Sequence, residues 1–288
     1  MLRNFFHIIR WPNLLMLAVI QGIIFYRLLQ PGLSVMGVAE MILLVTITMT
    51  IAASGYVIND YYDARIDSIN KPHRWIAGNT WSLKTVLNVY GVLIGAGALL
   101  SIFLAYKLSL IIYLFIYPVA IAGLWLYSFA LKCRPVAGNL WVALFCAGVV
   151  GVIALPDVLH GNEGVISKQL WYYSLFAFLS TWYREAVKDL EDMSGDQQAG
   201  CSTFPVRFGI MNGKIFSIVL GLLLVAALIA WEMTQTDSLK KLIFTVLEGS
   251  VVATTAFVWW SKDHTYFQKA SLLIKGVMLA GTLVLLIK

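Results

Sequence analysis

The acidic side chains that could do chemistry are concentrated in two short windows. The chain has 15 acidic residues in 288, and eight of them lie within residues 59–67 and 185–196. Residues spaced by three or four positions share one face of a helix. The spacing therefore predicts one oxygen-rich face in each window: Asn59, Asp63 and Asp67, and Asp189, Asp192 and Asp196.

These faces suit a hard cation. Mg²⁺ prefers oxygen ligands and usually completes its shell with water and phosphate oxygens. Neither window has His or Cys next to its acids, which argues against Zn²⁺. Basic residues, which can bind phosphate oxygens directly, accompany both windows: Arg65, Lys71, Arg74, Lys132, Arg184 and Lys188. Acids that hold Mg²⁺ beside such bases predict a diphosphate site. The alternative, solvated charges at helix ends, is weakened because the pattern occurs twice.

The elements that position these windows are apolar helices. The chain is 60% hydrophobic and 12% charged, whereas soluble domains carry about 25% charged residues. Its net charge of +6 is spread thinly between apolar runs, which excludes a nucleic-acid-binding surface. Membrane spans need about 20 apolar residues, and we predict nine in a single domain, 1–288: 13–30, 36–58, 85–106, 108–130, 137–156, 169–187, 211–231, 241–260 and 271–287.

The distribution of Lys and Arg predicts the orientation. Most basic residues fall on the side that holds the N-terminus and the two acidic windows, and an excess of positive charge marks the cytosolic side. We therefore expect a cytosolic N-terminus and an external C-terminus. The N-terminal apolar stretch lacks a clear small-residue cleavage site, so we expect it to be a retained first helix. Two long cytosolic loops are expected, one after the second span and one after the sixth. The link between the third and fourth spans is so short that they should form a tight hairpin.

The cysteines predict neither a metal site nor a disulfide framework. Cys133, Cys146 and Cys201 are far apart and lack metal-ligand spacing. We expect Cys146 in the core and the other two in cytosolic loops.

The two acidic windows and several shorter motifs resemble those of the UbiA superfamily of intramembrane prenyltransferases. The resemblance covers nearly the whole chain, although Trp75 departs from the usual Arg-Pro pair. The motifs that carry it are Arg10-Trp11-Pro12-Asn13, Asn59-x-x-x-Asp63-x-x-x-Asp67, Asn70-Lys71-Pro72-x-Arg74, Tyr127-Ser128 with Lys132 and Asn139, Asp192-x-x-x-Asp196, Ser202-Thr203, and Phe208-Gly209.

The resemblance implies an all-α membrane protein of about nine helices, arranged as in the UbiA prenyltransferases, with the two long loops capping the active site. It implies Mg²⁺ as cofactor, held by Asn59, Asp63, Asp67, Asp192 and Asp196, with Asp189 as a further ligand or a supporting partner. Substrate binding then falls to Asn13 on the acceptor side, Arg65, Lys71, Arg74, Tyr127, Lys132, Arg184 and Lys188.

The implied reaction is prenyl transfer from an allylic diphosphate. Tyr61, Tyr62 or Tyr127 would stabilise an allylic carbocation by cation–π attraction, or these rings belong to the aromatic belt at the membrane interface. The segment 184–196 looks most like the branch that makes ether lipids in prokaryotic cell membranes. That branch implies a geranylgeranyl donor and a glycerol-phosphate ether acceptor. An aromatic quinone precursor, prenylated by the same chemistry, is the alternative acceptor.

Two other classes of membrane protein remain as more distant alternatives. Asp60, Ala64 and Arg65 partly match the signature of CDP-alcohol phosphotransferases, but the glycine of that signature is missing. A cation transporter would explain Glu248 within a predicted span. However, transporters place their acids near the membrane midplane, whereas these acids cluster at one face.

Overall fold

The structure is a computed structural model that describes residues 2–29, 34–64, 67–68, 75–162 and 168–287. Over these ranges the regular structure is helical, apart from one isolated bridge between Ala77 and Trp81. This confirms the predicted all-α fold. The chain divides into two compact units, 1–131 with 152–166 and 132–151 with 167–288.

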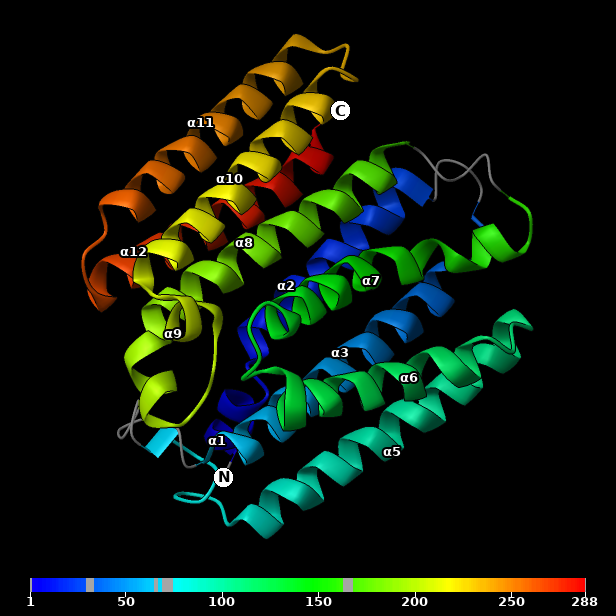
Figure 1. Ribbon diagram of the computed structural model, residues 1–288. Helices are drawn as coiled ribbons and strands as arrows, with labels where there is room; N and C mark the ends of the chain where they lie inside the picture. The colour runs from blue at the N-terminus through cyan, green and yellow to red at the C-terminus, as the bar shows by residue number, and fades with distance from the viewer. Residues whose placement is uncertain (1, 30–33, 65–66, 69–74, 163–167, 288) are drawn as a thin grey trace. The chain divides into compact units, whose positions relative to one another are not determined.

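The first unit holds the helices that lead to the first acidic window (Figure 1). Its elements are α1 (Leu2–Ile8), α2 (Trp11–Ile24), the π-helix η1 (Phe25–Leu29), α3 (Val38–Tyr62), α5 (Leu83–Leu108), α6 (Tyr113–Leu126), the π-helix η3 (Tyr127–Leu131) and the last part of α7 (Ala137–Leu159).

The second unit begins with the first part of α7 and contains the second acidic window. Its further elements are α8 (Lys168–Gln198), α9 (Phe204–Phe208), α10 (Ile210–Glu232), α11 (Ser238–Trp260), α12 (His264–Leu283) and the short 3₁₀ helix η5 (Val284–Leu286). Within this unit α10 packs against both α8 and α11, and α12 packs against α8 and α11.

Eight segments among the described residues are long and apolar enough to cross a membrane. They correspond to eight of the nine predicted spans. The ninth, predicted at 169–187, lies in α8, which is long enough but does not meet the same apolar criterion. Polar and charged side chains such as Gln169, Arg184 and Glu185 interrupt its apolar character. The predicted count of nine is therefore not reproduced.

The apolar character extends to the outer faces of the helices. Val92 and Leu99 on α5 are each 71% exposed, and Val119 on α6 is 68% exposed. A water-soluble protein rarely leaves so much contiguous apolar surface uncovered. These faces are those expected of helices that contact lipid tails.

The predicted loop after the sixth span is largely helix. α8 runs unbroken to Gln198, and α9 follows after five residues. The apolar stretch ends near Val187, but Ala186, Val187 and Leu190 are still buried at helical spacing. The end of an apolar run therefore did not mark the end of the helix, and the acids of the second window lie on a rigid element.

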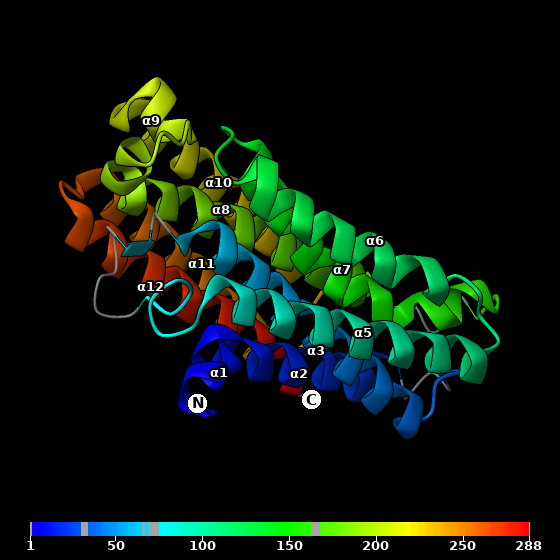
Figure 2. The ribbon, with the colours of Figure 1, turned by 90° about the horizontal axis from the view of Figure 1, so that it is seen from below.

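The predicted hairpin is confirmed in the first unit. α5 and α6 pack against each other, and they lie side by side in both views (Figures 1 and 2). The turn consists of residues 109–112 rather than the predicted break at Lys107–Leu108, and Ser109 at its start has a left-handed φ of 54°.

A long-range contact completes the first unit. The carboxylate of Asp157 in α7 is fully buried, and it accepts hydrogen bonds from the Ser34 hydroxyl and from the Val35 amide, both at 2.7 Å. These partners lie in the chain just before α3. The two bonds satisfy oxygen atoms that are buried away from water, and they join α7 to a segment more than 120 residues earlier.

Close helix packing in the second unit depends on glycine. A methyl group added at Gly281 of α12 would collide with the ring of Phe176 in α8, whereas one added at Gly276 of the same helix would meet nothing within 4 Å. Substitution at the first position must therefore displace the Phe176 ring or move the two helices apart, and substitution at the second need not.

We predict that Gly281→Ala destabilises the protein by about 1–3 kcal/mol, the usual cost of overpacking. Gly276→Ala should leave stability unchanged or raise it slightly, because alanine favours helix. Thermal unfolding in detergent, followed by loss of monodisperse protein, measures the effect. Equal unfolding temperatures for the two variants would contradict the predicted close contact.

Candidate active site

The first acidic window continues the helical path of α3. The amide of Asn59 donates a 2.7 Å hydrogen bond to the carboxylate of Asp63, and both side chains are buried. The backbone amides of Asp63 and Asp67 bond to the carbonyls four residues earlier, at 2.9 and 2.7 Å. The predicted spacing therefore does bring Asn59 and Asp63 together on one face.

Asp60 has a different role from its neighbours. Its carboxylate forms a 3.0 Å ion pair with Arg10, whose guanidinium also lies 4.8 Å from the centre of the Tyr56 ring. Arg10 joins α1 to α2 and has a left-handed φ of 51°. The pair therefore holds the first corner of the chain against α3.

Asp67 opens onto a cavity of about 200 Å³ in the first unit. The indole of Trp75 lies in its wall and donates a hydrogen bond to the carbonyl of Ala77. The residues that line the cavity are His7, Arg10, Asp60, Asp67, Trp75, Ile76 and Ala77. Trp75, the one position that departs from the expected motif, is thus part of a polar cavity wall beside the first window.

The tyrosines near this window lie among other aromatic rings. Tyr62 packs edge-on against Tyr61 and Phe129, with ring centres 5.3 and 5.8 Å apart. Its hydroxyl accepts a 3.1 Å hydrogen bond from Trp125. For Tyr62 these contacts favour the aromatic-belt interpretation. Tyr127 is half-buried at the start of η3.

Four further predicted residues belong to this unit. Asn13 is half-buried in the first turn of α2. Arg65, Lys71 and Arg74 lie outside the described residues.

The second window lies on the last turns of α8. Asp189, Asp192 and Asp196 occupy one continuous helix with spacings of three and four, so they share a face. The amide of Asn139 in α7 donates a 2.8 Å hydrogen bond to Asp189, and the Thr203 hydroxyl donates one of 3.1 Å to Asp196. Neutral donors from two other segments therefore orient this face.

Burial disfavours the ionised forms of two carboxyl groups in this window, Asp189 and Asp196. Burial raises the pKa of Asp189 to about 8, and the nearby Glu185 and Asp196 add to the rise, against the effects of Asn139 and Lys188. The pKa of Asp196 is also raised, first by burial and then by Asp192, while Thr203 and Lys132 lower it. A bound cation would relieve both penalties, because it stabilises the ionised forms.

The predicted bases of this unit lie close to these acids. Lys132 and Lys188 both act electrostatically on Asp196. Arg184 donates a 2.7 Å hydrogen bond to Glu185, while its Nε is buried without a hydrogen-bond partner in the described part of the chain. Such an unsatisfied donor can bind a phosphate oxygen.

A disulfide, which the sequence did not predict, shapes the same region. Cys133 and Cys201 are bonded with their Cα atoms 4.5 Å apart, and the Ser202 amide bonds to the Cys133 carbonyl at 3.0 Å. Both cysteines lie between helices, as expected, but the expectation of no disulfide was wrong. The two positions are 68 residues apart, and only the fold brings them together. The bond ties the segment before α7 to the end of α8, and so places Lys132 near Asp196.

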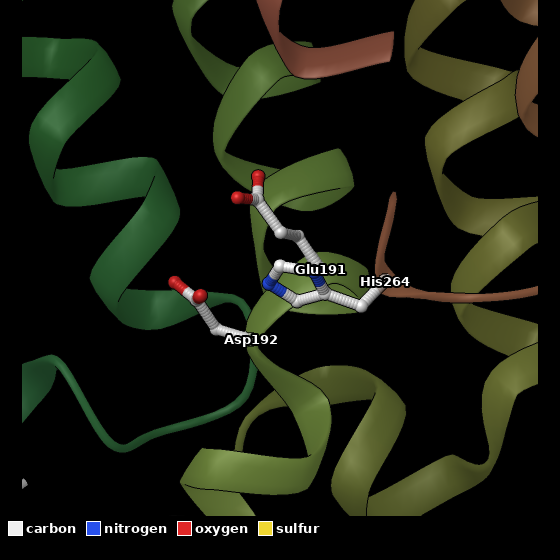
Figure 3. Close-up of side chains that lie close together, drawn as sticks. All are labelled: Glu191, Asp192 and His264. Carbon is white, nitrogen blue, oxygen red and sulfur yellow. The ribbon is translucent and has the colours of Figure 1, made fainter. Parts of the chain in front are cut away.

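His264 was also missed. Its imidazole, Glu191 and Asp192 offer ligand atoms that all lie within 4.8 Å of one another (Figure 3). The prediction that no histidine accompanies the acids holds along the chain but is wrong in space, because His264 begins α12, which packs against α8. No spacing in the sequence indicates this approach.

Comparisons with known proteins bear on the family and the fold of this chain. The model of the UbiA prenyltransferase family matches residues 14–279. The digeranylgeranylglyceryl phosphate synthase of Korarchaeum cryptofilum is 32% identical over 252 residues, 86% of this chain and 85% of that protein. The synthase of the same name from Methanobrevibacter smithii is 30% identical over 210 residues, 68% of this chain and 73% of that protein.

Solved structures share the fold. One, from work on digeranylgeranylglyceryl phosphate synthase in membranes, has a TM-score of 0.71 at 22% identity and covers 99% of this chain and 96% of its own. A UbiA homologue from Archaeoglobus fulgidus, bound to GPP and Mg²⁺, has a TM-score of 0.64 at 14% identity and covers 99% and 100%.

The extent of these matches defines the class of protein. The chain is an integral membrane protein and belongs to the UbiA prenyltransferase family. It is an enzyme that transfers prenyl groups.

We predict that protein purified in air exposes one alkylatable thiol, that of Cys146, when it is denatured without reductant, and three thiols after reduction. Intact-mass spectrometry counts the added groups. Cys133→Ser should expose two thiols without reductant, because Cys201 loses its partner. Three reactive thiols in the unreduced wild-type protein would contradict the observed pairing.

Proposed function

We propose that this enzyme transfers a geranylgeranyl group from its diphosphate to a glycerol-phosphate ether, with Mg²⁺ as cofactor. The observation that carries the proposal is the pair of acidic faces, in which Asp63, Asp189 and Asp196 are each oriented by a neutral donor. The sequence similarity to two digeranylgeranylglyceryl phosphate synthases supports the acceptor.

The donor atoms of both windows fit Mg²⁺. They are carboxylate and amide oxygens, the ligands that this ion prefers. Burial makes the ionised form of Asp189 unfavourable when no cation is bound, because it raises the pKa of that carboxyl group. The residues that would hold the ion are Asn59, Asp63, Asp67, Asp189, Asp192 and Asp196. When bound, Mg²⁺ neutralises the negative charge that develops on the departing diphosphate.

The bases have a complementary role. Lys132, Lys188 and the free Nε of Arg184 would bind the diphosphate oxygens, and Arg65, Lys71 and Arg74 would do so from the first window. The bond between C1 of the prenyl chain and the diphosphate oxygen breaks. A bond from C1 to the acceptor hydroxyl oxygen forms, and the hydroxyl proton is released. Asn13 would contact the acceptor and Tyr127 the prenyl group.

The proposal requires both units to act as one domain, with the two acidic windows serving a single reaction. It also sets the orientation. Both windows and the N-terminus would face the cytosol of a prokaryotic cell and the C-terminus the outside, because Lys and Arg accumulate beside the windows.

An acceptor panel tests the proposed function. Purified protein with Mg²⁺ and radiolabelled geranylgeranyl diphosphate should label geranylgeranylglyceryl phosphate, and labelling should stop when EDTA removes the metal. 4-Hydroxybenzoate, a naphthoate and homogentisate should stay unlabelled. Labelling of an aromatic compound instead would replace the lipid acceptor with a quinone precursor. Turnover of a CDP-alcohol, or ion flux that ignores prenyl diphosphate, would overturn the proposed chemistry.

The proposed metal ligands give a second test. Asp63→Ala and Asp192→Ala should each reduce transfer by about 100-fold or more, because charge stabilisation by a bound metal contributes several kcal/mol. Asp63→Asn should do the same while it still accepts the Asn59 hydrogen bond. Glu40→Ala is the matched control, because Glu40 lies in the first turn of the same helix. Wild-type turnover in either aspartate variant would remove that residue from the metal site.

A further inference from the structure

The group formed by Glu191, Asp192 and His264 combines two kinds of ligand. Two carboxylates come from adjacent positions on α8, and one imidazole comes from the first residue of α12. Both carboxylates are half-buried, whereas the imidazole is exposed. Figure 3 shows the ring reaching across to the two acids. The group is therefore open to an ion from solution.

The turn that carries His264 is held in place on both sides. Asp263 caps α12 by accepting hydrogen bonds from the amides of Thr265 and Tyr266, at 2.9 and 3.3 Å. Just before it, the ammonium group of Lys214 donates to the carbonyls of Trp259 and Ser261, at 2.9 and 2.6 Å. The imidazole thus projects from a fixed point of the backbone, which reduces the conformational entropy lost on binding.

This ligand set suits a different metal from Mg²⁺. Mg²⁺ takes oxygen ligands, whereas imidazole with carboxylates favours Zn²⁺, Co²⁺ and related ions, which bind nitrogen-containing sites more tightly. Zinc bonds of about 2.0–2.1 Å place tetrahedral ligand atoms about 3.3 Å apart. The observed separations, all within 4.8 Å, therefore close by small side-chain rotations. Three protein ligands would leave a fourth position for water.

We propose that Glu191, Asp192 and His264 form a second cation site, selective for Zn²⁺-class ions, through which such ions inhibit the enzyme. Asp192 belongs to both sites. An ion held by His264 and Glu191 engages the Asp192 carboxylate and so withdraws it from Mg²⁺ and the diphosphate. The binding part stands on the geometry alone, and the inhibitory part rests on the proposed function.

Binding is tested without catalysis. Co²⁺ added to tag-free protein in detergent should give visible d–d absorption that saturates at one equivalent and disappears when Zn²⁺ is added. His264→Ala and Glu191→Gln should each weaken Co²⁺ binding by about 10-fold to 100-fold or more. His160→Ala is the matched control, because His160 is another exposed histidine, at the end of α7. Co²⁺ binding by His264→Ala and Glu191→Gln that equals the wild type would overturn the site.

Inhibition is tested in the prenyl-transfer assay at constant, excess Mg²⁺. Zn²⁺ should inhibit the wild type and His160→Ala, whereas His264→Ala should keep its Mg²⁺-supported turnover and require at least about 10-fold more Zn²⁺ for the same inhibition. Unchanged Zn²⁺ sensitivity in His264→Ala would overturn the inhibitory role. If the protein transfers no prenyl group at all, the proposed function fails while the Co²⁺ result still decides the site.

Discussion

A carboxylate at the end of an apolar helix must be held without being neutralised if it is to bind a cation. The chain meets this constraint with neutral donors: Asn59 for Asp63, Asn139 for Asp189 and Thr203 for Asp196. A neutral donor fixes the direction of the oxygen atoms without placing a fixed positive charge beside them. Asp60 shows the contrast, because its ion pair with Arg10 gives it a structural partner instead.

The surrounding elements follow from this constraint. Asn139 and Asp189 lie on different helices, so α7 and α8 must be in register for one hydrogen bond to form. The disulfide between Cys133 and Cys201 holds the two segments that supply Lys132 and Thr203. In the second unit, a shift of one of these segments would therefore move the acids, their hydrogen-bond donors and the bases relative to one another. The electrostatic environment of the acids depends on how the helices pack.

The spacing of residues along the chain predicted which of them lie on the same helix. The step of four from Asn59 to Asp63 matches a hydrogen bond between the two side chains. The steps of three and four from Asp189 to Asp196 lie on one helix, and helical geometry alone determines which of its residues share a face. The apolar runs likewise predicted all-α architecture and the tight hairpin. The predicted end of α8 was wrong because hydropathy indicates only where an apolar segment ends. A helix can continue beyond that point when one of its faces stays buried, as it does at Leu190.

Contacts between segments that are distant in sequence were beyond the reach of spacing. Cys201 meets Cys133, and His264 meets Asp192, only through tertiary packing. A single sequence contains no local signal for either approach. The roles proposed for the acidic windows rest on the repetition of the pattern and on the family resemblance, because no single helix determines them.

The interleaving of the two units has a consequence for synthesis. The first unit is complete only when the end of α7 arrives, because Asp157 receives hydrogen bonds from Ser34 and Val35. By then the ribosome has already made residues 132–151, which belong to the second unit. The first unit can therefore be completed only after part of the second unit has been made, unlike in multidomain chains whose domains follow one another in sequence. The segment that contains Ser34 and Val35 therefore enters the membrane before Asp157, its hydrogen-bond partner, has been translated more than 100 residues later.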